Sequence, residues 1–98
     1  MIRKNYSKSR RVCRVTFDLF PQGPASRVAL CSEFNDWDPA AHPMHERKDG
    51  RFSTTVSLQS GESYRFKYLV DGKYWENDSA ADAYIQNAFG SEDSIVKV

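Results

Sequence analysis

The feature that most constrains this chain is the stretch Tyr64–Asp78, which reads YRFKYLVDGKYWEND. Its first half alternates apolar or aromatic residues with polar ones, the period-2 pattern of a β-strand with two different faces. Asp71-Gly72 follows, a pair that readily takes the positive φ angles of a tight turn, so the stretch predicts a β-hairpin. The return strand carries Tyr74 and Trp75 back toward Lys67.

The length of the turn decides which aromatic residue shares the face of Lys67. A two-residue turn pairs Val70 with Lys73. Tyr74 then lies on the face of Lys67, and Trp75 turns toward the core. A three-residue loop shifts the register by one and places Trp75 on that face instead. Either arrangement sets an aromatic plane beside a cationic donor. That combination suits a sugar ring, whose apolar side stacks on aromatics and whose hydroxyls accept hydrogen bonds.

Other segments show the same alternation, and clusters of Gly, Pro, Asn and Asp separate them. They are Arg10–Phe20, Arg27–Ser32, Phe52–Leu58 and Ser94–Val98. No segment has the length and 3.6-residue period of a helix. Residues 78–83 suffice for one helical turn, residues 84–90 are expected to be a loop, and residues 40–47 are too broken for an assignment. The sequence therefore predicts an all-β fold, an immunoglobulin-like β-sandwich of six to eight short antiparallel strands. The aromatic residues expected on its core faces are Phe17, Phe52, Tyr64, Phe66 and Tyr68.

The size and charge of the chain narrow the classes of protein to which it can belong. Its 98 residues allow one domain with one core, and a net charge of +1 argues against a dedicated nucleic-acid binder. Residues 1–10 carry much of the positive charge without periodicity, so we expect a flexible basic arm before a domain at 11–98. No apolar run approaches the roughly 18 residues of a membrane span, and no signal peptide is recognisable. We therefore expect a cytoplasmic protein without a membrane partner, with Cys13 and Cys31 reduced.

The sequence offers no catalytic or metal-binding pattern. His42 and His45 are separated by Pro43 and lack a further ligand, so they are expected to be exposed loop residues, and no metal or cofactor is predicted. Carboxylates cluster between residues 71 and 82. A glycosidase needs two of them across a cleft, whereas carboxylates in turns and at strand ends usually face water. We therefore expect a protein that is not an enzyme.

A second aromatic feature is the turn-rich segment at 33–39, EFNDWDP. Binding residues concentrate in loops, so Trp37 in this loop is a candidate platform for a ligand. The alternative is a lid residue that packs on the end of the sandwich.

Four phrases, in this order, resemble those of a known family. They are FNDW at 34–37, YRFKYLVDG at 64–72, WEND at 75–78 and FGSEDSIVKV at 89–98. They are similar to the glycogen-binding carbohydrate module found in the β subunit of AMP-activated protein kinase and at the N-terminus of isoamylases and glycogen branching enzymes. The similarity covers about residues 11–98. It implies an early-set immunoglobulin-like sandwich that binds α-1,4-linked glucans such as glycogen, starch or maltodextrins without catalysis.

The resemblance also implies partners. The first is an α-glucan polysaccharide or oligosaccharide, and the second is a glycogen-metabolising enzyme or another protein. The alternative function is that of an early-set scaffold or protein-interaction domain that has lost its affinity for sugar.

The sugar contacts of the family can be transferred one position at a time. Its loop tryptophan in F-N-x-W corresponds to Trp37, and its lysine in the strand before V-D-G corresponds to Lys67. Its second tryptophan corresponds to Trp75 if the W-x-x-D phrase is aligned, and to Tyr74 if the turn is aligned. The resemblance favours Trp75, because residues 75–78 repeat the family phrase.

The C-terminal part of the family site departs from the pattern in this chain. The kinase module has a leucine that inserts through the sugar ring, then a hydroxyl and an amide. These positions hold Phe89, Ser91 and Asp93. Phe89 is bulkier and planar, and Asp93 accepts hydrogen bonds but does not donate them while it is ionised.

Overall fold

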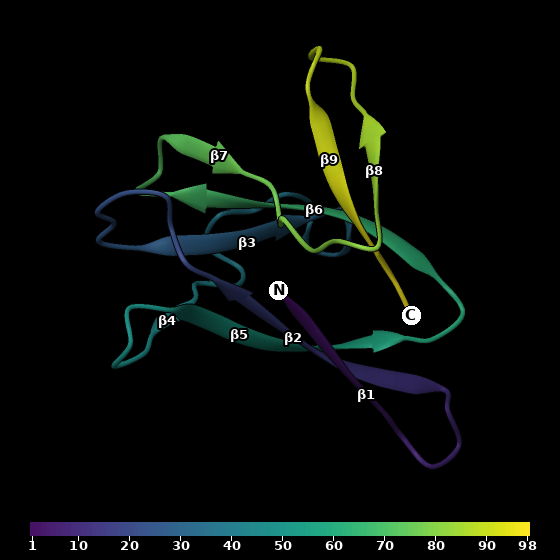
Figure 1. Cartoon of the computed structure of the whole chain (residues 1–98). Helices are drawn as coiled ribbons and strands as arrows, with labels where there is room; N and C mark the ends of the chain where they lie inside the picture. Colours follow the sequence, from purple (N-terminus) through teal and green to yellow (C-terminus); the bar gives the residue numbers. More distant parts are fainter.

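The computed structural model describes all 98 residues, which form two antiparallel β-sheets packed against each other (Figure 1). The first sheet consists, in spatial order, of β1 (Ile2–Tyr6), β2 (Val12–Leu19), β5 (Phe52–Gln59) and β4 (His45–Glu46). The second consists of β3 (Val28–Ser32), β6 (Ser63–Val70), β9 (Glu92–Lys97) and β8 (Ala83–Gln86), and β7 (Tyr74–Glu76) pairs with β6. The predicted all-β, immunoglobulin-like early-set sandwich is confirmed, with nine strands instead of six to eight.

The core lies between the two sheets and is built from the alternating apolar positions of their strands. Phe17 of β2 and Phe66 and Tyr68 of β6 are completely buried. The rings of Phe17 and Phe66 meet edge to face with centroids 5.0 Å apart, a favourable aromatic geometry. Phe52 is buried too, as predicted, whereas Tyr64 is only half-buried. The alternation in the sequence therefore identified most of the core correctly.

The prediction that residues 1–10 form a flexible arm is wrong for residues 2–6. These residues form β1, which pairs with β2 from Ile2 opposite Phe17 to Tyr6 opposite Cys13. Ile2 and Tyr6 pack against the core from the edge of the sandwich. The inward position between them is Lys4, whose ammonium reaches Asp82 at 2.7 Å. A lysine can occupy such a position because its aliphatic stem packs while its charge stays near water.

Two further segments also differ from the prediction. Residues 84–90 were expected to be a loop, but the first of them belong to β8, an edge strand paired with β9. Three of the four residues of β8 are exposed, so its sequence shows no alternation of burial. Within residues 40–47, Met44 is buried and the two residues of β4 pair with β5. His42 is half-buried instead of exposed, because its ring packs edge to face on that of Phe34 with centroids 5.8 Å apart. Its Nδ1 also lies 2.8 Å from the side-chain amide of Asn35.

The expectation that carboxylates near the central hairpin face water is wrong for Asp78, which is 1% exposed. The Tyr68 hydroxyl donates to Asp78 Oδ2 at 2.7 Å, and the α-amino group of Met1 lies 2.7 Å from the same oxygen. That amino group also donates to the main-chain oxygen of Asp18 in β2, so these contacts link the two sheets. Burial, and next the charge of Asp78, raise the pKa of the Tyr68 hydroxyl, which stays protonated as a donor.

Both cysteines are free thiols and buried. Burial, and next the nearby Asp38 carboxylate, raise the pKa of the Cys31 thiol. The helical content is a single three-residue 3-10 turn, η1 (Glu33–Asn35), and no helix in the structure has the length and hydropathy of a membrane span.

Candidate carbohydrate site

The outer face of the second sheet, which points away from the core, carries an open hollow of about 810 Å³, called here the outer-face hollow. The residues that line it are Glu33, Trp37, Arg65, Lys67, Trp75, Asn87, Ala88, Phe89, Ser91 and Asp93. They come from β6, β7, β9, the segment after β3 and the loop between β8 and β9. The hollow brings together six of the seven predicted site residues, and only Tyr74 lies outside it.

The register of the β6–β7 hairpin places Trp75 in the hollow. Val70 pairs with Tyr74 and Leu69 with Trp75, so residues 71–73 form a three-residue loop, as the family phrase predicted. Side chains on one strand alternate between faces, and residues directly opposite each other share a face. Trp75 therefore lies on the face of Leu69 and Lys67. Tyr74 is also exposed, but it belongs to the opposite face, at the edge of the sandwich.

The loop of this hairpin is fixed by its own backbone and by a neighbouring segment. Asp71 and Gly72 have φ angles of 54° and 68°, both in the left-handed region, which glycine adopts freely and aspartate more readily than most residues. The Asp71 carboxylate accepts hydrogen bonds from the backbone N–H groups of Ser26 and Arg27, at 2.7 and 3.0 Å. Those two bonds, first that of Arg27, hold the pKa of the Asp71 carboxyl below its ordinary value.

The two aromatic residues of the 33–39 segment point in different directions. Phe34 packs against the core, with its ring centroid 6.4 Å from that of Phe17 and 5.8 Å from that of Tyr64. Trp37 is half-buried and lines the outer-face hollow. Its backbone has a φ of 58°, unusual for a bulky residue, and its N–H donates to the Ser32 oxygen at 2.8 Å. Phe34 is thus the anchor of this loop, and Trp37 is the side chain that the loop presents.

Ser32 and Asn35 stabilise the same loop from within. The Ser32 hydroxyl accepts a hydrogen bond from the Phe34 N–H, and the Asn35 side-chain oxygen accepts one from the Ser32 N–H at 2.9 Å. This is the reciprocal pattern of a capping box, here at the start of η1. The Asn35 amide also donates to the Leu30 oxygen at 2.9 Å. The loop that carries Trp37 is therefore attached to β3 at several points.

The loop between β8 and β9 is organised by Asn87. Figure 1 shows this hairpin extending beyond the other strands of its sheet. The Asn87 side-chain oxygen accepts hydrogen bonds from the N–H groups of Phe89 and Ser91, at 2.9 and 3.2 Å. Its amide donates to the Ser91 hydroxyl at 2.9 Å and to Asp93 Oδ1 at 3.0 Å. The Phe89 side chain is 93% exposed, so this hydrogen-bonded loop presents a free aromatic ring at the edge of the hollow.

Asp93 lies deeper in the site than the resemblance suggested. It is 6% exposed, and its carboxylate is 3.7 Å from the Arg65 guanidinium and 4.0 Å from the Lys67 ammonium. Lys67 also donates to the Ser91 hydroxyl at 3.2 Å. The carboxylate of Asp93 therefore holds two cations and one amide in place at the base of the hollow.

The charges of the hollow balance. Arg65 and Lys67 are its cations, and Glu33 and Asp93 are its anions. The Glu33 carboxylate accepts a hydrogen bond from the backbone N–H of Arg65 at 2.8 Å. The arrangement offers aromatic surface and charged hydrogen-bond donors without net charge, which suits an uncharged ligand rich in hydroxyls. The structure contains no group of three or more His, Cys, Asp or Glu side chains placed to hold a metal ion.

Three functional candidates were missed by the sequence reasoning, namely Glu33, Arg65 and Asn87. Asn87 precedes the Gly90 turn by three residues, and asparagine that bonds the backbone two residues further on is a recognised turn signal. Arg65 and Lys67 are two positions apart on the same strand, so the alternation of side chains along a strand already placed both on one face. Glu33 carried no comparable signal.

The fold and the hollow define a small β-sandwich module whose outer face presents aromatic and cationic side chains. The chain belongs to the family of carbohydrate-binding module 48 (isoamylase N-terminal domain), whose model matches residues 5–85. The resemblance inferred from the four phrases is thereby confirmed.

Two relatives are 1,4-alpha-glucan branching enzymes. One is GlgB 2 of Xanthomonas campestris pv. campestris (strain 8004), 33% identical over 51 residues that cover 50% of this chain. The other is GlgB of Thiobacillus denitrificans, 32% identical over 65 residues that cover 64% of this chain. The matched regions amount to 7% and 8% of the length of these relatives, so the similarity concerns a small part of each enzyme.

Proposed function

We propose that the chain binds α-1,4-linked glucans, such as glycogen, starch or maltodextrins, in the outer-face hollow and does not turn them over. One observation carries the proposal. Trp37, Trp75 and Phe89 converge with Lys67 on a single hollow although they come from three separate parts of the chain.

Each group has a role that follows from its chemistry. The rings of Trp75 and Phe89, 50% and 93% exposed, offer flat apolar surfaces to the C–H faces of glucose units. Lys67, whose ammonium is held by Ser91 and Asp93, donates to sugar hydroxyls. A fixed donor loses less entropy on binding than a free lysine does, since its side chain is already ordered.

The hollow supports binding better than hydrolysis. Its carboxylates are Glu33 and Asp93, and both are engaged: one by the backbone N–H of Arg65, the other by Asn87 and two cations. A glycosidase needs one carboxyl group free to donate a proton and a second free to attack or to activate water. Asp93 is buried and held by three partners, so the hollow lacks a pair of free carboxyl groups, and we infer that the module is not an enzyme.

The partners and the compartment follow from the same proposal. The similarity to part of two branching enzymes supports a glycogen-metabolising enzyme as a protein partner, beside the glucan itself. Two free, buried thiols are typical of proteins kept in a reducing compartment, and we propose the cytoplasm.

Adjacent aromatic residues provide the test. Trp75→Ala should weaken binding of maltoheptaose, measured by isothermal titration calorimetry, by about 1 to 3 kcal/mol, the range known for aromatic platforms that stack on bases. Tyr74→Ala is the matched control, because Tyr74 is the more exposed of the two but lies outside the hollow. Its variant should bind like the wild type, and both variants should retain the unfolding midpoint.

Three results would contradict the proposal. Equal losses in the two variants would mean that the hollow is not the site. A wild-type protein that binds neither maltoheptaose nor insoluble starch would favour the alternative function, a sandwich domain that serves only to pack against another protein. Release of reducing ends from glycogen in proportion to the amount of pure chain would refute the absence of catalysis.

A further inference from the structure

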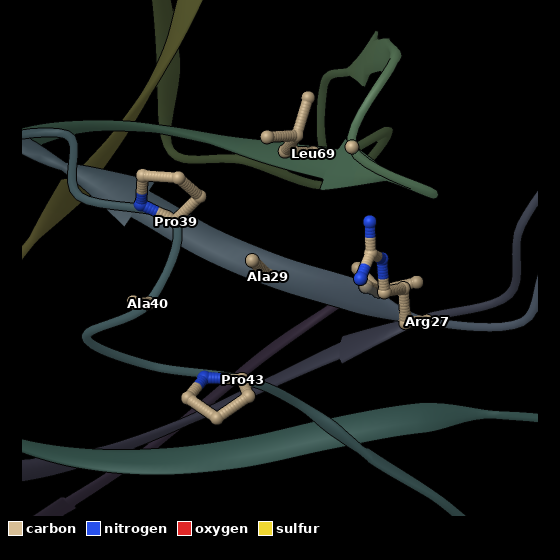
Figure 2. A pocket seen from close by; sticks show the side chains of 8 residues that line it. Arg27, Ala29, Pro39, Ala40, Pro43 and Leu69 are labelled. Carbon is tan, nitrogen blue, oxygen red and sulfur yellow. The ribbon is translucent and has the colours of Figure 1, made fainter.

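A second hollow, of about 450 Å³, lies on the same outer face, over β3 (Figure 2). The small side chain of Ala29 forms its floor, between Leu69 of β6 and the segment that follows η1. Figure 2 shows Pro39 and Pro43 on one side of Ala29 and Leu69 and Arg27 on the other. Most of its lining is aliphatic, and the Arg27 guanidinium is the charged group among the side chains that form it.

Arg27 has a fixed backbone and an unpaired guanidinium. Its backbone is attached to the β6–β7 loop, since its N–H donates to the Asp71 carboxylate at 3.0 Å and its oxygen accepts from the Asp71 N–H at 2.9 Å. The guanidinium extends toward Gly72, where its Nη2 lies 3.1 Å from the position that a Cβ would occupy. A side chain at residue 72 would therefore displace it. The guanidinium takes part in no salt bridge or side-chain hydrogen bond in the structure, so its donors are unused.

The two hollows adjoin at two places, the β6–β7 hairpin and the loop after η1. Leu69 lines the second hollow, and its cross-strand partner Trp75 lines the outer-face hollow. Cross-strand partners have their Cβ atoms only about 5 Å apart. In the loop after η1, Trp37 lines the outer-face hollow and Pro39 lines the second one. A ligand that lies on Trp75 and extends past Leu69 therefore enters the second hollow.

We propose that the second hollow is an extension subsite for the same α-glucan chain, which it contacts at glucose units beyond those stacked on Trp37 and Trp75. This inference rests on the proposed function. The aliphatic walls pack against the C–H surface of a sugar, and the Arg27 guanidinium donates to its hydroxyls. An extended, uncharged and repetitive ligand can occupy both hollows, because each further unit offers the same surface and the same hydroxyls as the last.

The length of the ligand separates the subsite from the main site. Maltotriose is short enough to be held by the outer-face hollow, whereas maltoheptaose can reach both hollows. The wild type should bind maltoheptaose more tightly, and Arg27→Ala should reduce that affinity about tenfold, the equivalent of one lost hydrogen bond to a charged donor. Binding of maltotriose should not change. A longer chain also has more registers in which to bind, but this advantage is the same in variant and wild type, so the ratio of the two affinities is the quantity to compare.

A second variant and a control make the test specific. Ala29→Leu places a larger apolar side chain on the floor of the hollow, and it should also lower the affinity for maltoheptaose selectively. Lys48→Ala removes an exposed cation from the turn between β4 and β5, on the other sheet, and should leave both affinities unchanged. Unfolding midpoints would identify any variant whose loss reflects folding.

The outcomes distinguish this inference from the function on which it rests. Equal losses for maltotriose and maltoheptaose in Arg27→Ala, or no loss for either ligand, would overturn the extension subsite while leaving the outer-face hollow as a glucan site. Failure of the wild type to bind either oligosaccharide would overturn the proposed function and the subsite with it.

Discussion

Removing the Asn87 side chain tests whether the β8–β9 loop is a rigid support for Phe89. Asn87→Ala eliminates four hydrogen bonds, to the N–H groups of Phe89 and Ser91, to the Ser91 hydroxyl and to Asp93. Each contributes about 0.5 to 1.5 kcal/mol net, and water can replace most of them because the loop is exposed. We therefore expect a loss of about 1 to 2 kcal/mol in the free energy of unfolding.

Asn87→Ala should also weaken the binding of maltoheptaose, even at temperatures where the variant is fully folded. If Asn87 acts by holding Phe89 in place, the loss of maltoheptaose affinity in Asn87→Ala cannot exceed that in Phe89→Ala by much. In the double variant the two losses should then coincide instead of adding, which a double-mutant cycle measures as a coupling energy. Calorimetric titrations well below the unfolding temperature would supply the four affinities. Asn5→Ala, an exposed asparagine of β1 whose side chain makes no hydrogen bond, is the matched control.

Two results would refute this reasoning. Losses that add fully in the double variant would show that Asn87 and Phe89 contribute independently, so that Asn87 contacts the ligand itself or supports another part of the site. Unchanged affinity in Asn87→Ala, with Phe89→Ala impaired, would show that the loop holds its conformation without these four hydrogen bonds.

Three further predictions concern the fold around the site. Tyr68→Phe should lower the free energy of unfolding in urea by about 1 to 3 kcal/mol, because it leaves the buried carboxylate of Asp78 without one of its donors; an unchanged midpoint would contradict this. Deletion of Lys73 should convert the three-residue loop to a two-residue turn, move Trp75 off the outer face and abolish its fluorescence response to maltoheptaose, whereas a retained response would show that the register survives. The pKa of Asp71 is lowered in the folded state, so its charge stabilises the fold at neutral pH, and this contribution is lost as the pH falls through the folded-state pKa. The difference in urea midpoint between wild type and Asp71→Asn should accordingly shrink below about pH 4, and a difference that grows on acidification would reverse the assigned sign.

Alternation along the chain was sufficient to find the strands whose two faces have different environments. β2, β5 and β6 each bury one face, so their sequences repeat with period 2, and they were predicted close to their observed bounds. β1 and β8 lie at the edges of their sheets, where burial is incomplete and polar residues are tolerated on both faces. Their sequences lack the alternation for that reason, and only pairing with a neighbouring strand shows that they are strands.

The identities of the site residues came mostly from the sequence, and their arrangement did not. The family phrases gave Trp37, Lys67 and Phe89, and the structure places all of them at one hollow. The choice of Trp75 over Tyr74 was favoured by the family phrase and is confirmed by the register of the hairpin. The depth of Asp93 and the role of Asn87 in ordering the β8–β9 loop were not predicted.

The sequence by itself determined the class of fold, the family and the kinds of side chain available to a ligand, because these depend on local alternation and on short phrases. The tertiary structure decided which of Tyr74 and Trp75 faces Lys67, because one residue more or less in the loop after Val70 reverses the face of every side chain that follows. It also decided that the carboxylates of Asp78 and Asp93 are buried. The hydrogen-bond and ion-pair partners that offset the cost of removing these carboxylates from water lie on other strands. Register and burial depend on contacts between strands, so they cannot be predicted from the sequence of a single strand.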